Sequence, residues 1–267
     1  MNLHYWRALN GIVTREVLRF LHQRERFLAA LVRPLVWLLV FAAGFRAALG
    51  LSIIPPYETY ITYETYIIPG LVGMIQLFNG MQSSLSMVYD REMGSMRTLL
   101  VSPLPRWFLL TAKLLAGTAV SILQVYAFLA IAAAFDIVLP PLGYLTALPA
   151  LVVSGLMLGA VGMLLSSTIK QLENFAGVMN FVIFPTFFLS SALYPLWKMQ
   201  ESSVLLYQIC AANPFTHAVE LIRFALYVQI NWVSLGWTVL ALAVFLAAAI
   251  YGYNPARGFM PRKAQAD

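Results

Sequence analysis

Polar side chains are rare inside the apolar stretches of this sequence, so the few that occur are the first candidates for a chemical role. Gln76, Asn79, Ser83 and Ser86 recur at steps of three, four and three, with Gln82 nearby, which places them on one face of a helix. Amides and hydroxyls on such a face can form hydrogen bonds to a neighbouring helix. They can equally line the path of a solute across a membrane, with Gln76, Asn79 and Ser83 as its wall. The sequence leaves both interpretations open.

A second candidate set joins one amide to several aromatic rings. Asn180 lies next to Phe181, and Phe184 and Phe188 follow in the same stretch, where Pro185 can kink a helix. An amide among aromatic rings suits an amphipathic solute, although phenylalanine that faces lipid is equally common. These residues are therefore a candidate contact surface for such a solute.

Four tyrosines occur in a near-perfect repeat of six residues, Tyr57–Thr62 followed by Tyr63–Ile68. We expect these side chains to face the outer side of a membrane. They would form either an aromatic belt at the level of the lipid headgroups or a stacking surface for a departing substrate such as a sugar. The tyrosines concerned are Tyr57, Tyr60, Tyr63 and Tyr66.

Charged residues are concentrated in the segment 90–107, which lies between two apolar stretches. Acidic residues at its start and basic residues further on suit the dipole of a short helix, and Pro103 and Pro105 would end that helix. A short rigid helix in this position can transmit force from a soluble motor, and a solvated loop is the alternative. The residues predicted to contact the motor are Asp90, Arg91, Glu92, Gly94 and Arg97.

Several motifs of enzyme chemistry are absent from the sequence. It contains no GxxxxGK(S/T) loop, no HExxH and no GxSxG, and its three histidines are scattered. The single cysteine excludes a disulfide framework. No carboxylate lies inside an apolar stretch, which weakens the case for an ion-coupled carrier. We therefore expect no catalytic residue, no metal site and no cofactor in this chain, and an energy source on another chain.

The elements that must position these residues are membrane helices. Of the 267 residues, 61% are hydrophobic and 10% are charged, whereas soluble domains carry about 25% charged residues. A helix needs about 20 apolar residues to cross a bilayer, and six windows of that length occur. We therefore expect an all-α membrane protein with six transmembrane helices, over Leu28–Gly50, Ile67–Val88, Phe108–Phe135, Tyr144–Thr168, Phe175–Leu196 and Trp232–Tyr253.

The N-terminal segment has a different pattern. Apolar and basic residues alternate at helical spacing over Leu3–Leu21, which predicts an amphipathic helix on the membrane surface. This helix is either a simple anchor or a docking surface for a cytoplasmic partner. Of the 17 lysines and arginines, only Arg46, Lys198 and Arg223 fall on the side opposite the termini, so both termini are predicted to be cytoplasmic. The net charge of +6 then reflects topology and attraction to anionic lipid, and we expect no nucleic-acid partner.

The outer segment Tyr194–Gln229 is too long for a turn and carries apolar residues at helical spacing. We expect one or two short helices that dip into the outer leaflet and pack on the bundle. Three glycines are expected to allow close helix packing, namely Gly155, Gly159 and Gly162. The chain thus divides into an interface helix (1–26), a six-span domain (27–253) and a cytoplasmic tail (254–267).

Three stretches stand out in order along the chain: Tyr66–Leu71, Asp90–Arg106, and Leu189–Leu196 together with Asn213–His217 and Arg223. They resemble, in that order, the start of span two, the coupling segment, and the end of span five with the outer helices of ABC-2 type exporter permeases. That family includes bacterial exporters of drugs, Nod factors and polysaccharides. The resemblance covers nearly the whole chain, and the doubled tyrosine segment departs from the family pattern.

The resemblance implies a half-transporter in the bacterial inner (cytoplasmic) membrane. Two copies would pair, and each would dock a separate ATP-binding subunit that holds ATP and Mg. The charged segment would be a coupling helix between spans two and three, spans two and five would line the path, and re-entrant outer helices would precede span six. The cargo would be amphipathic or lipid-like: a drug, a glycolipid or a lipid-linked glycan. The alternatives are an ion-coupled carrier or channel, and a membrane enzyme that acts on lipids.

Overall fold

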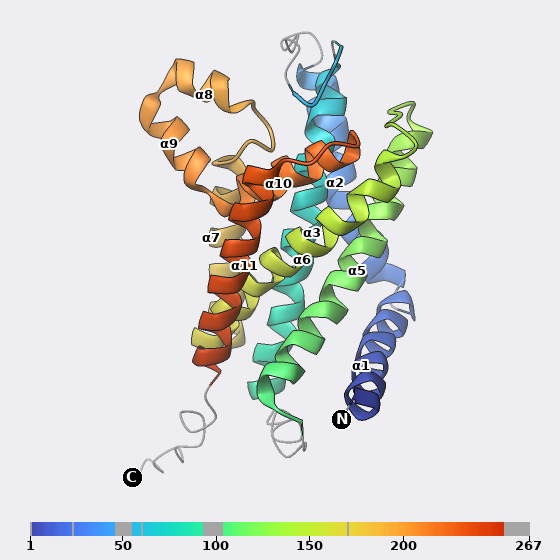
Figure 1. Ribbon diagram of the computed structural model, residues 1–267, viewed down its shortest axis with the longest axis vertical. Helices are drawn as coiled ribbons and strands as arrows, with labels where there is room; N and C mark the ends of the chain where they lie inside the picture. The colour runs from blue at the N-terminus through green and yellow to red at the C-terminus, as the bar shows by residue number, and fades with distance from the viewer. Residues whose placement is uncertain are drawn as a thin grey trace.

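The computed structural model describes residues 2–22, 24–45, 55–59, 61–92, 104–169 and 171–253. Within these ranges the chain forms ten helices and no strand (Figure 1), which confirms the all-α prediction for this part of the chain. The longer helices are α1 (Asn2–His22), α2 (Arg24–Phe45), α3 (Tyr63–Glu92), α5 (Arg106–Ala134), α6 (Gly143–Thr168), α7 (Leu172–Phe188) and α11 (Trp232–Gly252). The shorter helices are α8 (Leu196–Ser202), α9 (Val204–Ala212) and α10 (Pro214–Leu226).

One long helix lies in each of the six predicted apolar windows, because a long apolar run satisfies its backbone hydrogen bonds internally as a helix. Among the described residues, α5, α6 and α11 are long and apolar enough to cross a membrane. The apolar parts of α2 and α7 are shorter, at Ala30–Val40 and Leu172–Phe188. Helix α3 has 30 residues, and the amides and hydroxyls already noted interrupt its apolar surface.

Helix α7 ends at Phe188, before the predicted end of its window at Leu196. The amide nitrogen of the Asn213 side chain donates hydrogen bonds to the carbonyl oxygens of Thr186 (2.8 Å) and Leu189 (2.6 Å). The same side chain caps α10 by accepting a hydrogen bond from the backbone N–H of Phe215 at 3.0 Å. One residue therefore ends α7 and begins α10, a long-range arrangement that local apolarity does not reveal.

Helix α3 lies in the centre of the bundle, where it packs against α2, α5, α6, α7 and α10. The core around it is apolar, with Ile67, Leu71 and Met81 of α3 buried against Phe128 of α5 and Leu151 of α6.

The contact between α3 and α6 depends on glycine. A Cβ atom on Gly80 would lie 2.7 Å from the Cα atom of Gly159, and one on Gly162 would lie 2.8 Å from the carbonyl oxygen of Gly80. A Cβ atom on Gly155 would lie 2.8 Å from the Cγ2 atom of Thr118 and 3.0 Å from the Nε2 atom of Gln76. The predicted packing role of Gly155, Gly159 and Gly162 is therefore confirmed.

Gly80→Ala is expected to destabilise the bundle by about 1–3 kcal/mol, the usual cost of overpacking, because the new methyl group would meet backbone that cannot turn away. Gly177→Ala on α7 is the matched control, since a Cβ atom there has no neighbour within 4 Å. Apparent melting temperatures in detergent, followed by tryptophan fluorescence, measure the difference. Equal melting temperatures for the two variants would contradict the packing role.

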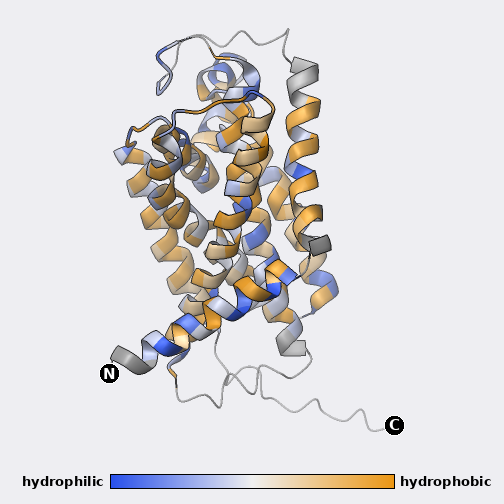
Figure 2. Cartoon of the chain, turned by 90° about the vertical axis from the view of Figure 1, so that its right-hand side faces the viewer, coloured by the Kyte–Doolittle hydropathy of each residue, from blue (hydrophilic) through white to orange (hydrophobic). Residues whose placement is uncertain are grey.

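Helix α1 crosses one end of the bundle obliquely, and Figure 2 shows polar and apolar residues alternating along it. The ring of Tyr5 on α1 packs edge-on against Phe108 of α5, with the ring centroids 4.9 Å apart. Phe20 is buried, whereas Trp6, Leu18 and Leu21 are exposed. The apolar residues of α1 are thus divided between the bundle and the surroundings, as an interface helix requires.

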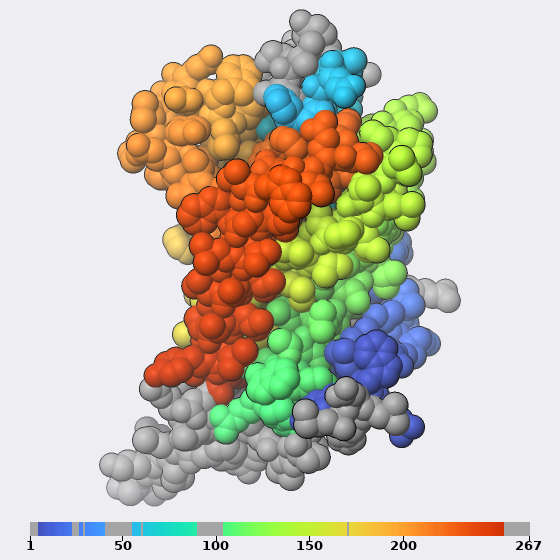
Figure 3. All heavy atoms as spheres, in the orientation of Figure 1, coloured from blue at the N-terminus to red at the C-terminus, as the bar shows by residue number. Residues whose placement is uncertain are grey.

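The opposite end of the bundle carries α8, α9 and α10, three short helices where one or two were predicted. Helix α10 is mostly buried against α3, α6 and α11, which confirms for α10 the prediction that the outer segment packs on the bundle. Helices α8 and α9 project as a separate lobe at that end (Figure 3), and Val204, Leu205 and Ile209 of α9 are exposed.

Candidate functional site

Gln76, the first polar residue of the predicted path on α3, is bound to α6. Its side-chain amide donates a hydrogen bond to the carbonyl oxygen of Leu151 at 2.7 Å, and its carbonyl oxygen accepts one from the hydroxyl of Ser154 at 2.7 Å. The residue is 1% exposed. Interhelical hydrogen bonding, one of the two interpretations from the sequence, is therefore confirmed for Gln76.

Asn79 faces a different helix, although it lies one turn from Gln76. Its amide nitrogen donates hydrogen bonds to the carbonyl oxygen of Ile75 within α3 (2.9 Å) and to the side-chain oxygen of Gln124 on α5. Gln124 is fully buried. It was not among the predicted site residues, although it is an amide inside an apolar window. The polar face of α3 is thus shared between two neighbours.

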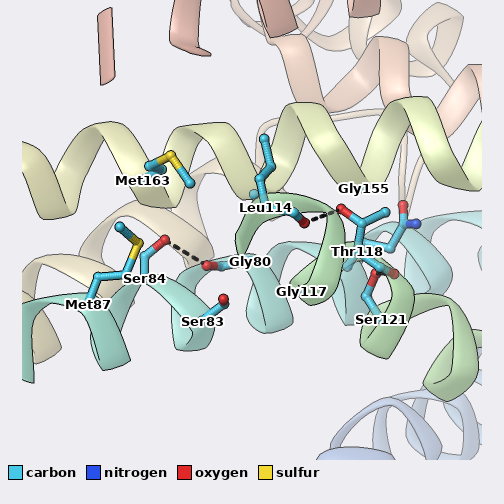
Figure 4. Close-up of a pocket in the computed structure, with 12 residues that line it drawn as sticks. Gly80, Ser83, Ser84, Met87, Leu114, Gly117, Thr118, Ser121, Gly155 and Met163 are labelled. Atoms are coloured by element: carbon cyan, nitrogen blue, oxygen red, sulfur yellow. Dashed lines mark hydrogen bonds between the residues drawn. The ribbon is translucent and has the colours of Figure 1, made fainter. Parts of the chain in front are cut away.

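A small cavity with polar and apolar lining residues lies where α3, α5 and α6 meet (Figure 4). Ser83 of α3 lines it together with Gly117, Thr118 and Ser121 of α5. The hydroxyl of Thr118 donates to the carbonyl oxygen of Leu114 at 2.9 Å, so it is satisfied within its own helix. The cavity volume of about 10 Å³ corresponds to one water molecule at most. In this conformation the cavity has no room for a solute.

The predicted residues on α7 form an exposed stripe, which we call the α7 stripe: Asn180, Phe181, Phe184 and Phe188. Phe181 is 78% exposed, and Phe184 and Phe188 stack with their ring centroids 6.4 Å apart. Phe184 also contacts Phe78 of α3 edge-on at 6.3 Å. The structure therefore brings α7 and α3 together through aromatic rings and leaves Asn180 on the outer surface of the single chain.

A second pocket, of about 120 Å³, opens between α2 and α3 beside Asn79, Gln82 and Gln124. The guanidinium carbon of Arg33 on α2 lies 3.8 Å from the ring centroid of Phe78, a cation–π distance. In the sequence, Arg33 contributed only to the predicted topology. Its position inside the first apolar window, where a charge needs a partner, is the signal that pointed to this contact.

The described tyrosines of the repeat are buried, not exposed. Tyr57, Tyr63 and Tyr66 are all buried, and Tyr60 lies outside the described residues. The hydroxyls of Tyr63 and Tyr66 donate to the carbonyl oxygens of Leu193 and Ser191, both at 3.0 Å. The expectation that these rings face the outer side of the membrane is therefore wrong for the three described tyrosines, because they pack beneath the segment that follows α7.

We call the three buried tyrosines Tyr57, Tyr63 and Tyr66, together with Glu220 and Arg223 of α10, the outer cluster. Arg223 is its charged centre and is 3% exposed. It donates to the side chain of Glu220 at 2.5 Å and to the carbonyl oxygen of Ser191 at 2.9 Å. Its guanidinium carbon lies 4.1 Å from the ring centroid of Tyr66. The cluster joins α3, the turn after α7 and α10 through one cation.

The electrostatics of the outer cluster leave Glu220 as the partner that balances Arg223. Burial raises the pKa of Tyr57, and burial, opposed by Arg223, raises the pKa of Tyr227 to about 12, so both phenols stay neutral. Burial lowers the pKa of Arg223, but the carboxylate of Glu220 outweighs it, and the pKa lies above its ordinary value. An ion pair inside a protein of this kind is costly to break on one side only.

Three of the predicted coupling residues lie at the end of α3, on the side of the bundle where α1 lies (Figure 1). Asp90, Arg91 and Glu92 form the last residues of α3, and Gly94 and Arg97 lie outside the described residues. Pro105 directly precedes α5 as its N-cap residue, with the extended backbone dihedral angles typical of that position. Their predicted contact with a motor subunit stays a prediction.

Comparison with known proteins gives one family match. The model of the family described as ABC-2 type transporter matches residues 7–227. The matched range contains the predicted coupling residues, the α7 stripe and the outer cluster.

Individual relatives agree with this match. The chain is 26% identical over 228 residues to "Putative transport permease ycf38" of Pyropia yezoensis, covering 84% of this chain and 75% of that protein. It is 31% identical over 206 residues to "Probable multidrug ABC transporter permease YbhR" of Escherichia coli (strain K12), covering 73% of this chain and 53% of that protein. A shorter match to "Nodulation protein J" of Rhizobium leguminosarum bv. viciae is 33% identical over 82 residues, covering 31% of this chain and 30% of that protein.

Proposed function

The chain belongs to the ABC-2 type transporter family, and from this premise we propose that it forms the export path for an amphipathic or lipid-like cargo. It is a membrane component of an ABC transporter and not itself an enzyme, since ATP hydrolysis takes place on the partner. In the proposed complex, two copies of the chain pair in the bacterial inner membrane with both termini cytoplasmic. Each copy crosses the membrane six times, through α2, α3, α5, α6, α7 and α11.

The observation that carries the proposed path is the α7 stripe. Phe181, Phe184 and Phe188 expose ring faces on one side of α7, and Asn180 adds an amide to the same side. Aromatic rings offer a large apolar contact area, and the amide offers a donor and an acceptor. A second copy placed opposite this stripe would enclose a path lined by both kinds of group. The cargo classes that suit such a lining are drugs, glycolipids and lipid-linked glycans.

Helix α3 supplies the route by which force would reach the path. At about 1.5 Å per residue, its 30 residues extend from the outer cluster, past Gln76 and Asn79, to the coupling residues Asp90–Glu92. Its tight glycine contact with α6 favours movement of the two helices as one body. Closure of the ATP-binding subunits would push on the coupling segment and on α1, and α3 would transfer the push to the outer cluster.

The path assignment predicts that the α7 stripe is in contact with water during transport. The chain has one cysteine, Cys210, which is buried, so single cysteines can be placed in a Cys210→Ser background. Asn180→Cys and Phe181→Cys are expected to react with a charged, water-soluble thiol reagent roughly ten-fold or more faster than a cysteine in lipid, because thiolates form in water.

Leu240→Cys on α11 is the matched control, since Leu240 is also exposed in the single chain and lies on an apolar helix. The rates are measured in membranes that contain the assembled complex, with and without ATP. If the α7 positions react as slowly as Leu240→Cys in both states, then the stripe faces lipid and the path lies elsewhere.

A further inference from the structure

Arg33 is a charged residue inside α2, one of the six helices proposed to cross the membrane. It lines the pocket of about 120 Å³ between α2 and α3, which we call the α2–α3 pocket. A charged side chain within a membrane span is costly and normally has a partner of opposite charge. Within the described part of the chain, Arg33 forms no hydrogen bond and no ion pair. Its donors are therefore available to a ligand.

An aromatic ring holds the guanidinium group of Arg33 against α3. The guanidinium carbon lies 3.8 Å from the ring centroid of Phe78. At about 1.5 Å per residue, Phe78 is roughly 20 Å along α3 from Glu92, the last residue of that helix. The side chain is thus packed on the flank of α3 and not extended toward its end. The ring fixes the position of the cation and leaves its N–H groups unused.

Gln124 of α5 brings a second unused donor to the same pocket. Its side-chain oxygen accepts a hydrogen bond from Asn79, which fixes the orientation of the amide. Its Nε2 atom is buried and has no hydrogen-bond partner among the described residues, although buried amides are normally paired. Two helices far apart in the sequence therefore bring unpaired donors to one pocket, which indicates a ligand that accepts hydrogen bonds.

The other residues of the α2–α3 pocket define the chemistry of this ligand. Of the described residues that line it, none is acidic and Arg33 alone is charged. A carboxylate, phosphate or sulfate group would satisfy both the guanidinium group and the amide. The volume has room for such a group, whereas a drug-sized molecule needs roughly 300 Å³ or more. The apolar lining residues are Ala30, Pro34, Met74, Ile75 and Phe78.

Phe78 connects the α2–α3 pocket to the α7 stripe. Its ring packs edge-on against Phe184 of the stripe, with the ring centroids 6.3 Å apart, and also lies beneath the guanidinium group of Arg33. One aromatic ring therefore separates the unpaired cation from the proposed path. An amphipathic molecule can place its apolar body on the stripe while its charged group reaches the pocket.

We propose that the α2–α3 pocket binds an acidic group of the amphipathic cargo, with Arg33 as its cationic partner and the amide of Gln124 as a second donor. This inference rests on the proposed function, because it specifies which cargo the path prefers. Among the cargo classes named above, it favours the molecules that carry a carboxylate, phosphate or sulfate group. An amphiphile without such a group still contacts the α7 stripe but binds more weakly.

The test compares two dyes that differ in one group: rhodamine 19 has a free carboxylate, and rhodamine 6G is its ethyl ester. Their dissociation constants for the full chain, without an ATP-binding subunit, are measured by fluorescence anisotropy in phosphatidylcholine nanodiscs. The signal from empty nanodiscs is subtracted. The wild-type chain is expected to bind rhodamine 19 roughly ten-fold more tightly than rhodamine 6G, the size of one charge-assisted contact.

Variants at the pocket assign this preference to particular residues. Arg33→Gln is expected to remove it, and Arg33→Lys to keep part of it, because the charge remains while the planar fork is lost. Arg7→Gln is the matched control, since it removes an exposed arginine that does not line the pocket. Gln82→Leu removes an exposed amide that lines the pocket. It is expected to reduce the preference several-fold, which keeps the test valid if the Arg33 variants fail to fold.

Three results would overturn the proposal. The first is equal affinity of the wild-type chain for the two dyes, and the second is a preference that persists in Arg33→Gln. The third is loss of the preference when phosphatidylglycerol is added to the nanodiscs, because the pocket would then hold an anionic lipid and not cargo. Since no ATP is present, a chain that shows the preference but transports nothing would contradict the proposed function alone. Transport without the preference would contradict this inference alone.

Discussion

Arg223→Met is expected to destabilise the folded chain by about 3 kcal/mol, the lower end of the range for breaking a buried ion pair from one side. The substitution leaves the Glu220 carboxylate without the guanidinium group that it binds at 2.5 Å. It also removes the donor to the carbonyl oxygen of Ser191 and the cation above the ring of Tyr66. The apparent melting temperature in detergent measures the loss.

Two further variants make this expectation specific. Lys198→Met removes an exposed lysine from the same end of the bundle and is expected to change the melting temperature little. Combining Arg223→Met with Glu220→Gln is expected to recover part of the stability, because no unpaired charge is then left in the cluster. An Arg223→Met variant that melts no earlier than Lys198→Met would show that the outer cluster does not hold α3, α10 and the turn after α7 together.

Glu92→Ala and Arg97→Ala are each expected to reduce ATP-driven export about ten-fold or more, while the chain still inserts into the membrane. The reason is that a hydrogen bond to a charged group contributes about 1.5–3 kcal/mol, and the proposed coupling segment would transmit force through such contacts. Lys263→Ala in the C-terminal tail is the control. The measurement is ATP-dependent transport by the reconstituted complex, normalised to the amount of inserted chain. Unchanged ATP turnover and unchanged export in both variants would contradict the coupling role.

The helices of this chain could be predicted largely from its sequence. Windows such as Phe108–Phe135 and Tyr144–Thr168 coincide closely with α5 and α6, because a long apolar run is a local property that determines a local structure. The end of α7 could not be predicted in this way. Residues 189–195 include the weak helix formers Ser190, Ser191 and Pro195, but the side chain that binds the carbonyl oxygens at the end of α7 belongs to Asn213, which lies far along the sequence.

The residues of the candidate site were harder to place. Helical periodicity put Gln76 and Asn79 on one face, but the structure assigns the first to α6 and the second to α5. Which neighbour each residue meets depends on how closely the helices approach, and Gly80 and Gly159 allow α3 and α6 to approach closely. Periodicity carries no information about partners on other helices.

The tyrosine repeat shows the same limit more sharply. Repetition and composition indicated rings at an interface, yet Tyr66 is buried under Arg223. A cation buried on α10 and a ring on α3 are far apart in sequence, so neither residue predicts the other. Arg33 above Phe78 is a second case, in which an arginine counted toward topology also packs on an aromatic ring.

The most direct measurement of the central claim uses proteoliposomes that contain the chain alone or together with its ATP-binding subunit. The probe is an amphipathic dye, rhodamine 6G, and both ATP hydrolysis and dye movement are followed. The account predicts no ATP hydrolysis and no uphill dye movement from the chain alone, even under an imposed ion gradient, and ATP-dependent movement when both subunits are present. Uphill movement by the chain alone under an ion gradient would contradict it.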